Sequence, residues 1–180
     1  LYLRIASQGA VSAPSTLWQP AALWLQDQTT YSIFSLYFGL LIGLLLYNLL
    51  LFLSVRDPAY LIYVVFVACI GLSQAANSGL GAQFLWPDAL WWNSNSINAT
   101  HAASGSFGIW FVRSFLASKT SMPNMDRWIV GQTVLWFATF AGSLVLPYKT
   151  AGLIVTGLAI VGVVTVLVAG ALSVRRGHPG

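Results

Sequence analysis

Charged residues are scarce in this sequence. Its 180 residues include eight Lys or Arg and four Asp or Glu, so that only 7% are charged. A soluble domain typically carries about 25% charged residues, and this chain has too few to solvate the surface of a soluble protein of its size. Hydrophobic residues make up 57% of the chain. The composition therefore predicts a membrane protein.

Cysteine and catalytic motifs are equally scarce. The single cysteine, Cys69, excludes an internal disulfide and a cysteine-based zinc site. The chain lacks the H-E-x-x-H, C-x-x-C, G-x-x-x-x-G-K and G-x-S-x-G motifs. A serine hydrolase would need a nucleophile such as Ser73 or Ser104 and a base such as His101, but nothing in the sequence orients the histidine. We therefore expect no catalytic residue, cofactor or metal site in this chain.

The positions of the charges divide the chain into membrane spans. Five long intervals are free of charge: 28–55, 58–87, 89–112, 128–148 and 150–174. Each can hold the roughly 20 apolar residues that cross a bilayer as a helix. The sequence predicts spans at about 30–54, 59–78, 92–115, 128–146 and 150–174. Asn124 or Asp126 is placed to cap the fourth.

The first two spans form a hairpin around a charged turn. In the charge-free interval 28–55, apolar residues occupy every phase of a helical repeat, which leaves no polar face for water. The turn is Arg56-Asp57-Pro58, and proline suits the first turn of the helix that follows. We expect Arg56, Asp57 and Tyr60 to form a coupling turn at the cytoplasmic surface, and this hairpin to transmit signals.

The N-terminal residues differ from the rest. Residues 1–6 alternate like a β-strand, and a strand cannot stand alone, so we interpret it as the remnant of a larger extracytoplasmic β-domain. A turn-rich connector follows, and 17–26, with Trp18 and Trp24, has the composition of an interfacial segment. The predicted domains are 1–26, the end of this outer domain, and 27–180, a truncated transmembrane domain.

The basic residues predict the orientation. With the N-terminus outside, six fall on the inner side and two, Arg4 and Lys149, on the outer side; the inner six are Arg56, Arg113, Lys119, Arg127, Arg175 and Arg176. The positive-inside rule favours this orientation. The basic residues flank spans rather than clustering on one face, so membrane topology explains them better than nucleic-acid binding.

The third predicted span is half polar. A spanning helix must turn such polar groups toward protein or a water-filled cavity. The first half of this third span and the end of the second span together carry five polar residues that we expect near the outer face. These are Gln74, Asn77, Asn95, Asn98 and His101. Two interpretations remain open. The cluster is either a pocket for a small ligand or a hydrogen-bonded network that holds the helices together.

Three stretches carry a resemblance to a known family. They are Leu46-Tyr47-Asn48 with the following LLLFLSVRDPAYLIY, then Phe84-Leu85-Trp86-Pro87, and Phe111-Val112-Arg113-Ser114-Phe115-Leu116. The chain resembles the bacterial seven-transmembrane receptors with diverse intracellular signalling modules. LYLRIAS at the N-terminus looks like the exit of that family's extracytoplasmic β-sandwich sensor.

The resemblance implies an all-α transmembrane bundle of seven spans, of which this chain would hold about five. It also implies the bacterial inner membrane, a periplasmic N-terminus and a cytoplasmic output in the same polypeptide, such as a diguanylate cyclase or histidine kinase. The ligand is unknown, and a carbohydrate is one candidate. Such proteins often act as homodimers, although no stretch here marks a dimer face. The alternative is a transporter or binding subunit that uses the outer polar cluster, but all four acidic residues lie outside the predicted spans.

Overall fold

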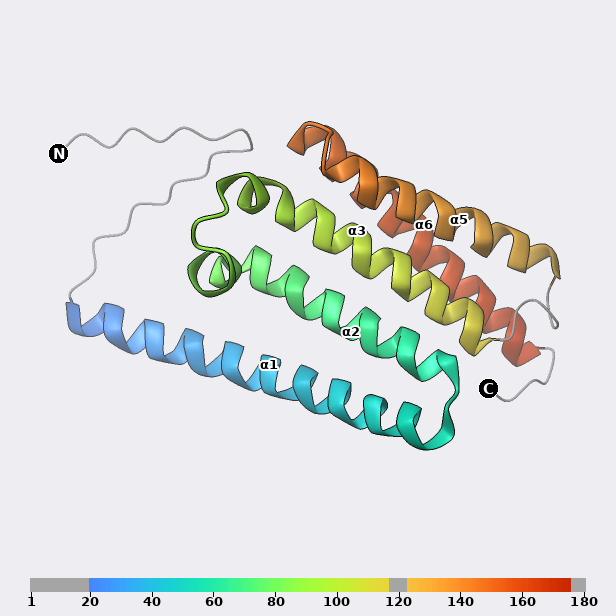
Figure 1. Cartoon of the computed structure of the whole chain (residues 1–180), viewed down its shortest axis with the longest axis horizontal. Helices are drawn as coiled ribbons and strands as arrows, with labels where there is room; N and C mark the ends of the chain where they lie inside the picture. Colours follow the sequence, from blue (N-terminus) through green and yellow to red (C-terminus); the bar gives the residue numbers. More distant parts are fainter. Residues whose placement is uncertain (1–19, 117–122, 176–180) are drawn as a thin grey trace.

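The computed structural model describes residues 20–116 and 123–175, and these form an assembly of long helices. The elements in chain order are α1 (Pro20–Val55), α2 (Pro58–Asn77), η1 (Gly81–Leu85), α3 (Leu90–Phe115), α5 (Pro123–Ser143) and α6 (Tyr148–Arg175). Successive long helices run in opposite directions (Figure 1). The all-helical prediction is confirmed for this part of the chain. The strand expected at residues 1–6 lies outside the described residues.

The helix α1 has 36 residues. At 1.5 Å per residue it is about 54 Å long, well beyond the hydrocarbon thickness of a bilayer. It begins at Pro20 rather than near Thr30, so the segment expected to lie separately at the interface is continuous with α1 from Pro20 onward. The reason is that 20–29 contains no glycine and no internal proline to end the helix. The domain boundary predicted after residue 26 falls inside this helix.

Three described helices are long and apolar enough to cross a membrane, over Trp24–Val55, Pro58–Asn77 and Tyr148–Ser173. They correspond to the first, second and fifth predicted spans. The third and fourth coincide with α3 and α5, which have 26 and 21 residues but contain more polar side chains. That these two helices also cross the membrane stays a prediction.

The turn between α1 and α2 combines the proline expected in the first turn of α2 with a cap and a backbone conformation that were not predicted from the sequence. Asp57 caps α2 and its carboxylate accepts a hydrogen bond from the Ala59 amide at 2.9 Å, with Pro58 in the first turn. Arg56 has a φ of 60°, the left-handed conformation that costs a residue with a Cβ about 1–2 kcal/mol. The chain therefore reverses within two residues, and α1 packs along α2.

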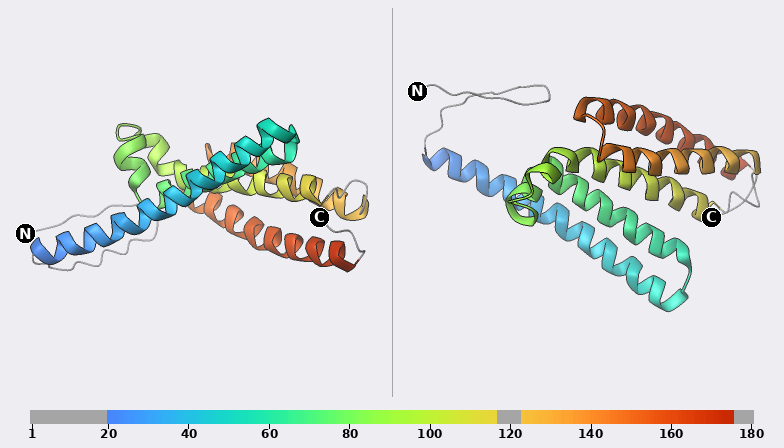
Figure 2. Two further views of the ribbon diagram at one scale, coloured as in Figure 1. Left: turned by 90° about the horizontal axis from the view of Figure 1, so that it is seen from below. Right: turned by 45° about the horizontal axis from the view of Figure 1, so that its top comes forward.

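The helix α3 is at the centre of the assembly. It packs against α2 on one side and against α5 and α6 on the other. Figure 2 shows α6 in a second layer behind α3 and α5. A buried core joins α3, α5 and α6 and consists of Ala102, Ile109, Ile129, Trp136, Val155 and Leu158. The outermost helix, α1, exposes most of its apolar surface.

Gly105 allows the closest approach in this core. A Cβ at this position would lie 2.5 Å from the Trp136 ring. The indole of Trp136 is only 4% exposed, so it has little freedom to move aside. Small residues at helix interfaces let neighbouring helices approach in lipid, where no hydrophobic effect drives them together.

We therefore expect Gly105→Ala to destabilise the bundle by about 1–3 kcal/mol, the usual cost of overpacking. Thermal unfolding in detergent, followed by a thiol-reactive dye that labels Cys69 as it becomes exposed, measures the loss. Gly157→Ala is the matched control, because a Cβ there meets no heavy atom within 4 Å. Trp136→Phe should rescue Gly105→Ala in part. Equal melting of the Gly105→Ala and Gly157→Ala variants would contradict the close approach.

Candidate functional site

A hydrogen bond joins α2 to the N-terminal half of α3. The Ser73 Oγ lies 2.9 Å from His101 Nδ1, and the same Nδ1 lies 2.8 Å from the carbonyl oxygen of Ile97. A carbonyl oxygen can only accept, so the Nδ1 atom carries the hydrogen and donates it. Ser73 is 6% exposed. This contact is therefore an interhelical hydrogen bond inside the bundle.

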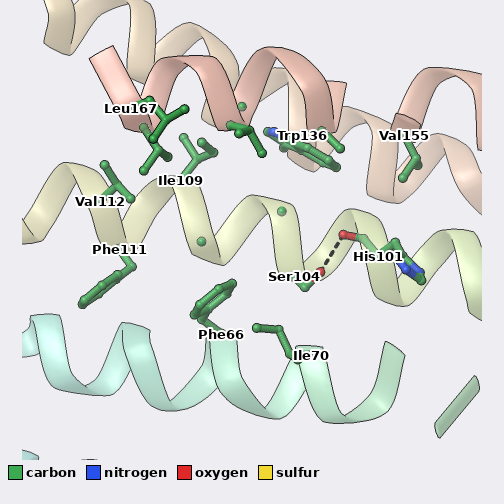
Figure 3. A pocket seen from close by; sticks show the side chains of 16 residues that line it. Phe66, Ile70, His101, Ser104, Ile109, Phe111, Val112, Trp136, Val155 and Leu167 are labelled. Atoms are coloured by element: carbon green, nitrogen blue, oxygen red, sulfur yellow. Dashed lines mark hydrogen bonds between the residues drawn. The ribbon is translucent and has the colours of Figure 1, made fainter. Parts of the chain in front are cut away.

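The same geometry tests whether His101 could activate Ser73 or Ser104 as the nucleophile of a serine hydrolase. Nδ1 carries its proton, so it has no lone pair with which to take a proton from Ser73. The other candidate, Ser104, donates its hydroxyl to the main-chain oxygen of His101 at 2.8 Å rather than meeting the ring (Figure 3). The arrangement suits helix packing and not nucleophile activation.

A second hydrogen bond joins α3 to α6. Asn98 is 7% exposed, and its Nδ2 donates to the main-chain oxygen of Tyr148 at 3.0 Å. Gly152, one turn further along α6, lies beside this amide, and a Cβ there would make an ordinary van der Waals contact, 3.5 Å from Asn98 Oδ1. An amide in an apolar setting needs such a partner. Asn98 therefore fixes the start of α6 against α3.

The five residues of the predicted outer pocket do not bond to one another within the described chain. Gln74 is half-buried and Asn77 is exposed at the end of α2. Asn95 donates to the main-chain oxygen of Trp91 on its own helix at 3.0 Å. Asn98 and His101 contact different helices. The geometry supports the network interpretation for Asn98 and His101, and a ligand pocket stays a prediction.

An ion pair joins α3 to α5 at the opposite end. Arg113 Nε lies 2.8 Å from Asp126 Oδ1, and Arg113 Nη2 lies 3.1 Å from Asp126 Oδ2. Asp126 was expected to be a possible cap of the fourth span, and this is wrong because it lies within α5, already helical at Pro123. Asn124, the other expected cap, is also inside α5. Arg113 lies near the end of the third predicted span and Asp126 just before the fourth. Their opposite charges could have indicated this ion pair from the sequence.

The predicted coupling turn borders a cavity of about 380 Å³ at this same end. Asp57 and Tyr60 line it together with Asn48 of α1, and Phe111 and Ser114 come from α3. The ring of Tyr63 lies 5.1 Å from that of Phe111, centroid to centroid. Asp57 and Tyr60 thus line one cavity beside the end of α3, whereas Arg56 is not among the residues that line it.

We expect Asp126→Asn to lower the free energy of unfolding by about 1–2 kcal/mol, because it replaces a charge-assisted pair that is partly open to solvent. The exchanged pair Arg113→Asp with Asp126→Arg should recover part of the loss. Melting of both variants in detergent checks this. Additive losses in the exchanged double variant would contradict a direct pair.

The left-handed Arg56 gives a separate prediction. Arg56→Gly removes the Cβ strain and should keep or raise stability, whereas Arg56→Val should lower it by about 1–2 kcal/mol, because a β-branched residue is worst at positive φ. Both variants remove the same charge, so their difference in melting temperature isolates the backbone effect. Equal melting temperatures would show that the turn does not hold this conformation.

The family comparison agrees with this architecture. A family model described as 7TM diverse intracellular signalling matches residues 30–180, most of the chain. No curated protein and no solved structure gives a significant match. The match covers all the long helices described above, except the first turns of α1. The chain belongs to the 7TM diverse intracellular signalling family, a family of transmembrane signalling receptors.

Proposed function

We propose that this chain is the membrane relay of a bacterial inner-membrane receptor, with its N-terminus in the periplasm. It carries a signal from an extracytoplasmic sensor domain to a cytoplasmic output in the same polypeptide, such as a diguanylate cyclase or histidine kinase. A carbohydrate is the ligand class we favour. The relay itself performs no chemistry. The observation that carries the proposal is the family match over residues 30–180.

The contacts of α3 support a relay by providing a route between the two ends of the bundle. In its N-terminal half, α3 bonds to α2 through His101, near the middle of the helix, and to α6 through Asn98. Near its C-terminal end it bonds to α5 through Arg113 and borders the cavity beside the coupling turn. A shift of the outer end would therefore reach the turn through one stiff helix. Signalling requires two packings of this bundle that the signal stabilises unequally.

The Ser73–His101 bond is the contact to perturb, because it is interhelical and lies far from the turn. Ser73→Ala removes one interhelical hydrogen bond, worth about 0.6 kcal/mol on average in membranes. If the bond differs between the two packings, the basal output should shift by up to about threefold. We expect this shift in full-length receptor in lipid nanodiscs supplied with labelled ATP or GTP, with phosphoryl transfer and cyclic dinucleotide formation both followed.

Ser94→Ala is the matched control, because its hydroxyl is exposed and bonds to Trp91 of its own helix. It should leave the basal output unchanged. Melting curves for each variant separate a loss of fold from a change in signalling. If the folded full-length protein forms neither a phosphorylated product nor a cyclic dinucleotide, this result counts against both the cyclase and the kinase output. An unchanged output in folded Ser73→Ala and in folded Asn98→Ala would contradict a relay through α3.

A further inference from the structure

A long apolar groove of about 560 Å³ lies over one face of α3 in the described bundle. Phe66 and Ile70 of α2 lie on one side of it, and Val155 and Leu167 of α6 lie on the other, with Trp136 of α5 behind (Figure 3). Nearly all of its lining atoms are apolar, and His101 and Ser104 are its polar residues.

The groove is elongated along the helix axes. On α3 its lining runs from His101 to Val112, and on α6 it runs from Val155 to Leu167. At 1.5 Å per residue, each side is about 17–18 Å long. This length is more than half of the roughly 30 Å hydrocarbon core. Its shape fits a rod that lies parallel to α3 better than a compact ligand.

The floor and rim of the groove suit another helix. Gly108 and Gly162 line it, and small residues permit close helix packing in lipid. Along its rim, large apolar side chains of α6 have no cover, since Val163 is 60% exposed and Leu167 is 67% exposed. By contrast, Val155 of α6, which also lines the groove, is only 8% exposed. The groove thus resembles half of a helix interface.

The family to which the chain belongs indicates what fills the groove. Its description specifies seven transmembrane segments, while the described ranges 20–116 and 123–175 contain five long helices. We propose that the groove between α2, α3 and α6 is the seat of a further transmembrane helix of the same receptor. That helix closes the bundle over α3 and links α6 to α2. The proposal rests on the seven-span family and not on the proposed output, so either can fail alone.

The test uses the full-length receptor in lipid, with Cys69 and every cysteine outside these 180 residues replaced by alanine. One variant carries Val163→Cys and the other Val164→Cys, each with a nitroxide label. The two neighbouring valines share residue type and depth, and they are 60% and 54% exposed in the described bundle. Val163 lines the groove, whereas Val164 faces a separate surface hollow beside Trp128. Oxygen collision rates measured by electron paramagnetic resonance report access to lipid.

We expect the label at Val163 to lose oxygen access relative to the label at Val164. Equal access would show that lipid fills the groove and would overturn the proposal. Unlabelled Val163→Cys is then paired with cysteines placed along the next apolar span of the receptor. An intrachain disulfide supports the assignment. A disulfide formed only between two chains would place a second copy in the groove and would also overturn it.

Discussion

The packing of this receptor domain depends on the cost of polar groups within a membrane. The third long helix, α3, carries serine, threonine, asparagine and histidine residues along much of its length. We predict that α3 crosses the bilayer, which would offer these groups no hydrogen-bond partner, so that they would have to find one on their own helix or on a neighbour. Within the described chain, Ser96, Thr100 and Ser106 bond to carbonyls of the preceding turn. His101 and Asn98 reach α2 and α6 instead.

This constraint explains why α3 is central and α1 is peripheral. A helix with polar groups on several faces needs protein on several sides, and α3 packs against three helices. An apolar helix has no such need, and α1 leaves its surface for lipid or for parts of the receptor outside the described residues. The same arrangement gives α3 interhelical contacts in its N-terminal half and near its C-terminal end, which a relay would require. Stability and signalling would then depend on the same few bonds.

Much of the fold was predictable because it follows from local sequence. Long charge-free intervals mark the helices, and their described bounds lie near the predicted ones except at the start of α1 and α5. Pro58 and Asp57 mark the start of α2 through capping chemistry that involves adjacent residues only. The π-helical turn η1 was not expected, because 79–92 offered glycines and tryptophans without any periodicity.

The pairings between helices were not predictable in the same way. The sequence singled out His101 and Asn98 as polar groups needing partners. It placed Ser73 or Ser104 beside His101 only as an outline of a hydrolase, and it did not identify the Tyr148 carbonyl as the partner of Asn98. Which residue faces which depends on helix rotation and on relative height, and those depend on packing at Gly105 and Trp136. Asp126 was misjudged for a related reason. Its role depends on Arg113 of another helix, and capping rules consider only its own.

The central claim is that α3 and α5 cross the bilayer although their polar residues make them less apolar than α1, α2 and α6. The most direct measurement is the sidedness of single cysteines in intact cells, with Cys69→Ala as the background. Gln83→Cys in η1 and Lys149→Cys at the start of α6 should both react with a membrane-impermeant maleimide, while Arg127→Cys near the start of α5 should not. Equal labelling of positions 83 and 127 would place both ends of α3 on one side and contradict the account.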